Sequence, residues 1–169
     1  MRLFKPMLAS IITLAFYSQV GAAEELPITG SVASKCTIHT DRAGVYGNPT
    51  ASVLSTDSVD GGTPAIVRFD VVNASTYKAV ITTPNSFTSS PALNDTLAWT
   101  GSTEVSAVTD SNMSAYDSNK RVFDNVTEID LTVAGTVWFK ANSRVEYGYN
   151  KSLPGGTYKA IVTAECIAL

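Results

Sequence analysis

The sequence has 169 residues, a net charge of −3 at neutral pH and only 16% charged residues. This balance argues against nucleic acid or an anionic membrane as the partner, because both bind through basic patches. The composition is rich in Thr, Ser, Val and Ala, which favours strands over helices.

The first 23 residues have the three parts of a secretory signal peptide. Arg2 and Lys5 charge the first part, residues 6–17 form a short apolar run, and residues 21–23 are small. The apolar run is too short for a membrane-spanning helix, which needs about 20 residues. We expect residues 1–23 to be cleaved on export, which leaves 146 residues with ten basic and fifteen acidic side chains. That length suits one domain with a proper core.

Two cysteines remain after cleavage, Cys36 and Cys166. In an exported protein an even pair predicts a disulfide, and the alternative is two free thiols. The chain-entropy model gives such a long closed loop about 4–5 kcal/mol of stabilisation.

Apolar side chains alternate with period two in several segments, which is typical of half-buried strands. In chain order the predicted strands are 65–72, 76–82, 97–99, 104–108, 127–133, 136–140 and 157–169. The turn residues 73–75 predict a hairpin between the first two strands. Residues 110–120 predict an exposed loop, and Trp138 is expected in the core. Many short strands separated by turn-rich segments predict an all-β sandwich.

Both ends of the exported chain carry long alternating patterns. The final run, 157–169, places apolar side chains on one face: Tyr158, Ala160, Val162, Ala164, Cys166 and Ala168. Near the start, an apolar face formed by Leu26, Ile28, Gly30 and Val32 alternates with Pro27, Thr29 and Ser31. This first pattern predicts either an ordinary first strand or a strand that another chain binds.

Together the two ends resemble subunits of bacterial chaperone–usher pili. The resemblance implies a single immunoglobulin-like sandwich over 35–169 that lacks its last strand, preceded by a donor extension at 24–34. A periplasmic chaperone and then the extension of another subunit complete the fold by strand addition.

The resemblance also implies roles for particular residues. The donor residues are Leu26, Ile28, Gly30 and Val32. The acceptor groove wall is Gly156, Tyr158, Ala160, Val162, Ala164 and Ala168. The sequence departs from the pattern of these subunits in two ways. Such subunits often have Tyr at the penultimate position, where this chain has Ala168. Their usual disulfide joins two N-proximal strands, whereas Cys166 lies in the last strand.

The function that this resemblance implies is structural. The chain is expected to pass through the periplasm and the outer-membrane usher and to join identical or related subunits in a surface fibre for adhesion or biofilm formation. It needs no cofactor and no small-molecule substrate. The alternative is a self-contained secreted sandwich, an adhesin or matrix protein, that binds glycans through exposed Tyr147 and Tyr149.

Residues for catalysis or metal binding are scarce. The single histidine, His39, lies three residues after Cys36, so the two side chains point to different faces of a strand. We interpret two carboxylate pairs as parts of solvated turns rather than as calcium sites: Asp57 with Asp60, and Asp110 with Asp117. We therefore predict neither an enzyme nor a metal protein.

Overall fold

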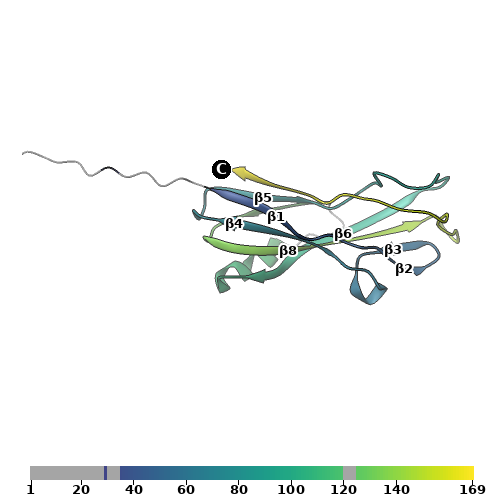
Figure 1. Cartoon of the computed structure of the whole chain (residues 1–169), viewed down its shortest axis with the longest axis horizontal. Helices are drawn as coiled ribbons and strands as arrows, with labels where there is room; N and C mark the ends of the chain where they lie inside the picture. Colours follow the sequence, from purple (N-terminus) through teal and green to yellow (C-terminus); the bar gives the residue numbers. More distant parts are fainter. Residues whose placement is uncertain (1–28, 30–34, 120–124) are drawn as a thin grey trace, which may run out of the picture. The chain divides into compact units, whose positions relative to one another are not determined.

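Two antiparallel sheets stack face to face as a sandwich (Figure 1), which confirms the predicted all-β fold. The computed structural model describes residues 29, 35–119 and 125–169. Its strands all lie within 33–169, one of two units into which the chain divides. The signal peptide and the donor residues Leu26, Ile28, Gly30 and Val32 lie outside the described residues.

The larger sheet has the order β1-β4-β8-β3-β2, and β6 pairs with the opposite edge of β8. Its strands are β1 (Cys36–Arg42), β2 (Gly47–Thr50), β3 (Val53–Ser55), β4 (Ala65–Val71), β6 (Leu97–Val108) and β8 (Gly135–Tyr147). The long strand β8 organises this sheet, because it pairs with β4 along its first half and with β3 along its second.

The smaller sheet has the order β7-β5-β9. Its strands are β5 (Tyr77–Thr82), β7 (Val126–Asp130) and β9 (Thr163–Ala168), and two short 3-10 helices, η1 (Ser58–Asp60) and η2 (Ser111–Asn119), lie in connections. In the centre of this sheet Ala79 lies opposite both Ile129 and Cys166.

The core fills the space between the sheets with alternate side chains of the strands, on the predicted faces of β4 and β5 but on the opposite face of β8 from the predicted Trp138. Phe69, Ile81, Val137 and Phe139 are fully buried. The rings of Phe69 and Phe139 lie 5.7 Å apart in an edge-to-face arrangement, the geometry that aromatic pairs prefer.

The predicted hairpin between residues 65–72 and 76–82 is wrong. The strands form as β4 and β5, but they belong to different sheets. Their apolar faces, which include Phe69 and Ile81, pack into one core cluster and therefore face each other across it. The connection crosses between the sheets, with Ser75 at a positive φ of 58° and its N–H donating to the carbonyl of Leu131.

Several further elements differ in extent from their predictions, and β8 in particular continues to Tyr147, well beyond the predicted 136–140. The two short strands at 97–99 and 104–108 form one strand, β6. The predicted loop at 110–120 contains η2, which buries Met113 and Tyr116. The final strand, β9, is shorter than 157–169 and begins at Thr163.

Candidate functional site

The two lateral openings of the sandwich differ. On one side, β6 and β7 are the outer strands, and η2 packs against both. Met113 is fully buried, and Tyr116 lies 6.4 Å from the ring of Phe139 and accepts a hydrogen bond from the N–H of Val133 at 3.0 Å. The chain therefore fills this opening with its own side chains.

On the opposite side, β1 and β9 are the outer strands of their sheets. In the part of the chain that the structure describes, β1 pairs with β4 alone and β9 with β5 alone. Each strand thus presents an unpaired backbone edge to the other, and such an edge readily pairs with an additional strand.

The predicted disulfide between Cys36 and Cys166 is confirmed, and it ties these two outer strands together at one end. The two Cα atoms are 6.4 Å apart. Away from this bridge the strands enclose a cavity.

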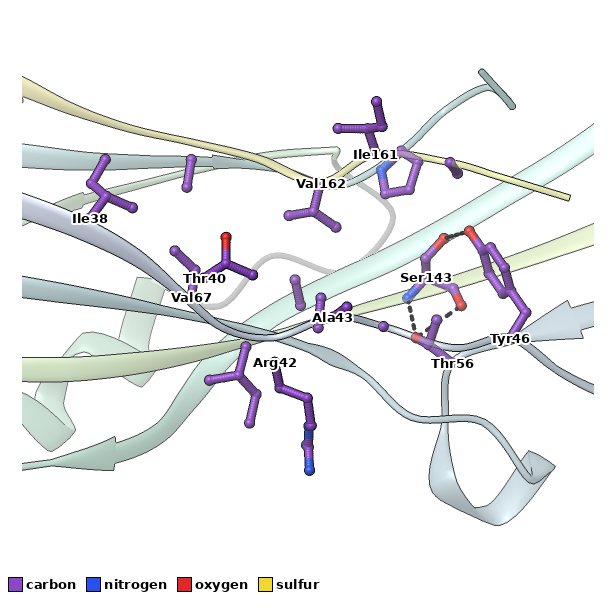
Figure 2. Close-up of a pocket in the computed structure, with 17 residues that line it drawn as sticks. Ile38, Thr40, Arg42, Ala43, Tyr46, Thr56, Val67, Ser143, Ile161 and Val162 are labelled. Atoms are coloured by element: carbon purple, nitrogen blue, oxygen red, sulfur yellow. Dashed lines mark hydrogen bonds between the residues drawn. The ribbon is translucent and has the colours of Figure 1, made fainter. Parts of the chain in front are cut away.

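This cavity, the β1–β9 groove, has a volume of about 350 Å³. Its walls come from β1 with the residues that follow it and from residues 160–164 (Figure 2). Figure 2 shows Val162 pointing into the groove toward Thr40 and Val67, and Ile161 also lines the groove but is 49% exposed. A second cavity of about 370 Å³ shares Gly44, Tyr46 and Ala160 with the first and extends the groove toward Gly156 and Tyr158.

The groove floor is apolar at one end and polar at the other. Val67 lies toward the apolar end, whereas Tyr46, Thr56 and Ser143 form a hydrogen-bonded cluster at the polar end (Figure 2). The hydroxyls of Tyr46 and Ser143 are 2.9 Å apart, and Thr56 Oγ1 accepts from the Ser143 N–H at 2.8 Å.

The polar floor carries no charge at neutral pH. Burial raises the pKa of Tyr46 above its ordinary value, and the hydrogen bond with Ser143 opposes this effect in part. The floor therefore suits a neutral, largely apolar occupant, and the one charged side chain among the described residues that line the first cavity is that of Arg42 on β1.

An aromatic cluster packs at the end of the groove that is farther from the disulfide. Phe87 packs 4.7 Å from Trp99, 5.1 Å from Tyr158 and 6.4 Å from Tyr46, measured between ring centroids. The Tyr158 hydroxyl donates to the carbonyl of Pro154 at 2.6 Å. These contacts position the start of the C-terminal segment. Residues 160–162 of this segment lie outside the strands.

Five of the six predicted groove-wall residues line the groove. Ala160, Val162 and Ala164 line its first part, and Gly156 and Tyr158 line its continuation. Ala168 lies beyond the disulfide, is exposed and lines neither part.

The residues of the opposite wall and of the floor were not predicted from the sequence. Ile38 and Thr40 come from β1, Tyr46 follows it, and Thr56 and Ser143 are distant in sequence. The weak alternation of Ile38, Thr40 and Arg42 was the one local signal for this wall.

The aromatic residues considered for glycan binding have different environments. Tyr149 is 89% exposed, but Tyr147 is buried, and its hydroxyl accepts from the N–H of Asn94 at 3.0 Å. The expected exposure of Tyr147 is therefore wrong, because β8 continues to this residue and points it inward. The expected core position of Trp138 is also wrong: it is half-buried on the other face of β8, because its neighbours Val137 and Phe139 occupy the core.

Three of the remaining polar candidates have structural partners. His39 is half-exposed, with Nε2 3.4 Å from Asp70 Oδ2. Asp57 accepts a hydrogen bond from the N–H of Val59 at the start of η1, and Asp60 pairs with Arg144 at 3.0 Å.

The part of the chain that the structure describes shows neither a cluster of metal ligands nor a membrane-spanning helix. Within 35–119 and 125–169, no three His, Cys, Asp or Glu side chains gather as a metal site would require. None of the helices found there has the length and apolar character to cross a bilayer.

The fold and the groove define a class: an all-β sandwich with one lateral opening filled by its own chain and the other left as a groove between two outer strands. No family model matches the sequence, and no curated protein matches it.

Proposed function

We propose that this protein is a structural subunit of an extracellular bacterial fibre, and that residues 24–34 of one copy fill the β1–β9 groove of another. The observation that carries the proposal is the pair of unpaired outer strands on either side of an apolar groove. A strand added there hydrogen-bonds to a sheet edge and places alternate side chains in the groove.

The proposed occupant fits the groove in length and chemistry. Residues 26–32 span roughly 20 Å at about 3.3 Å per residue in a strand, and Ile38 to Gly44 on the groove wall covers the same number of residues. Leu26, Ile28 and Val32 supply apolar side chains, and no charged residue lies between Glu25 and Lys35.

The proposal includes the route to the fibre. The signal peptide directs export to the periplasm, where an open groove and an unpaired edge are an aggregation hazard. A periplasmic chaperone covers the groove until an outer-membrane usher exchanges it for the next subunit. The resulting surface fibre supports adhesion or biofilm formation.

Paired substitutions in the full exported chain test the exchange. Ile28→Asp removes the donor by placing a charge on its apolar face, and Val162→Asp removes the acceptor by placing a charge inside the groove, since burying an unpaired charge is costly. We expect either variant alone to lose polymers by at least tenfold in light scattering after size-exclusion chromatography.

Mixing the two variants gives the sharpest readout. The intact donor of Val162→Asp should fill the intact groove of Ile28→Asp, so that 1:1 dimers form instead of polymers. Thr29→Asp and Thr163→Asp are the matched controls, because both residues are exposed neighbours of the substituted positions, and Thr163 does not line the groove. These controls should polymerise like the unmodified chain.

A stable monomer from the unmodified chain, at all concentrations tested, contradicts the proposal. The second candidate, a self-contained glycan-binding sandwich, would then rest on Tyr149, whose ring is 89% exposed. Loss of sugar binding on Tyr149→Ala would support that candidate.

A further inference from the structure

The disulfide lies at one end of the β1–β9 groove and restricts the space between the two outer strands. A strand seated between two others in a sheet separates them by about 9.6 Å, because neighbouring strands lie about 4.8 Å apart. The Cα atoms of Cys36 and Cys166 are only 6.4 Å apart, and the bridge itself crosses the gap. An added strand therefore cannot run between these two residues.

The groove begins directly beside this bridge. Ile38 on β1 and Ala164 on β9, each two residues from a bridged cysteine, are the first of its lining residues on either wall. From there the cavity extends toward Gly44 and Gly156, away from the disulfide. The groove thus has one blocked end and one continuing end.

The wall formed by the C-terminal segment specifies register only weakly. Ala160, Val162 and Ala164 repeat small apolar side chains at two-residue spacing, so that a donor displaced by two residues meets similar chemistry. Because side chains in a strand alternate with period two, such a slip keeps the same face inward. A register stop is needed to select one alignment.

We propose that the Cys36–Cys166 disulfide is this stop: it blocks one end of the groove and fixes the register of the donated strand. The inference rests on the proposed function, because it concerns a strand bound in that groove. It assigns both cysteines a positioning role in assembly, in addition to their role in stability.

Photo-cross-linking in the assembled full chain tests the stop. The probe is p-benzoylphenylalanine in place of Thr29, an outward-facing donor position, and mass spectrometry maps the acceptor residues that it labels. In the oxidised polymer we expect one set of contacts and none at residues 166–169. In the Cys36→Ser/Cys166→Ser variant we expect additional contacts displaced by two residues toward that end.

Hydrogen exchange on the oxidised polymer gives a second measurement that does not depend on the folding of the cysteine variant. Amides of residues 38–44 and 156–164 should gain protection on assembly, whereas residues 167–169 should not. Protection gained at 167–169, or an unchanged single register without the disulfide, overturns the inference while the proposed function stands. Absence of polymer in every form overturns the proposed function and the stop together.

Discussion

At the residue scale, Tyr46 has the least expected role in the groove. It follows β1 in a glycine-rich stretch with no alternating pattern, yet its side chain reaches the floor and bonds with Ser143 across nearly a hundred residues of sequence. Its ring also packs against Phe87 at the far end of the groove. The folded state therefore favours the neutral phenol over the phenolate.

This preference predicts a dependence of stability on alkaline pH. The folded-state pKa of Tyr46 is raised above its ordinary value of 10.0, so its contribution is present below pH 10.0 and is lost as the pH rises through the folded-state pKa. Tyr46→Phe should remove part of this alkaline loss, and at neutral pH it should cost about 0.5–1.5 kcal/mol through the lost hydrogen bond.

Urea unfolding across the alkaline range measures this effect. Tyr158→Phe is the comparison, because burial also raises the pKa of Tyr158. An alkaline loss that is unchanged in Tyr46→Phe would contradict the assignment to Tyr46.

At the scale of elements, η2 determines which side of the sandwich is open. Its two buried side chains, Met113 and Tyr116, fill the opening between β6 and β7. The facing opening between β1 and β9 has no such helix in residues 35–119 and 125–169. A donated strand is consequently expected on one side only.

Removing the buried Met113 side chain should therefore destabilise the fold without affecting the groove. Met113→Ala should cost about 2–5 kcal/mol, the range for large apolar side chains truncated in a core. Val59→Ala is the matched control, since Val59 lies in the other 3-10 helix, is 87% exposed, and should change stability by less than about 0.5 kcal/mol. Equal losses of unfolding free energy in the two variants, measured by denaturant unfolding, would show that η2 does not fill this opening.

At the scale of the whole molecule, the disulfide links residues 130 positions apart and joins the outer strands of the two sheets. Cys36→Ser/Cys166→Ser should lower the free energy of unfolding by about 2–5 kcal/mol, because the unfolded chain regains its loop entropy. The Ile28→Asp background keeps the chain monomeric, so that assembly does not contribute to the measurement. A loss below about 1 kcal/mol would contradict a major role for the bridge in stability.

The faces of the strands were predictable from the sequence, but their partners were not. The alternation in 65–72 and 76–82 identified Phe69 and Ile81 as core residues, since side-chain direction in a strand follows from local geometry. The hairpin predicted between them failed, because turn residues permit a sharp reversal and equally permit a crossing between sheets. Packing of both apolar faces into one core decided between these two outcomes.

The candidate site likewise contains residues that were predictable from the sequence and residues that were not. Ala160, Val162 and Ala164 belong to one continuous alternating pattern, so their common apolar face was predictable from one segment of sequence. The facing wall and the floor come from distant segments that meet only after both sheets form, and Tyr147 was misplaced because the end of β8 depends on its pairing with β6.

By itself, the sequence determined the all-β class, the inward faces of β4, β5 and β7 and the two cysteines that bridge, because these properties depend on composition and period-two alternation. The tertiary structure alone decided that β1 and β9 are the outer strands beside the groove, that η2 fills the opposite opening, and that the bridge lies at the end of the groove. Each of these results depends on contacts between residues far apart in sequence, which form only when the two sheets close around a common core.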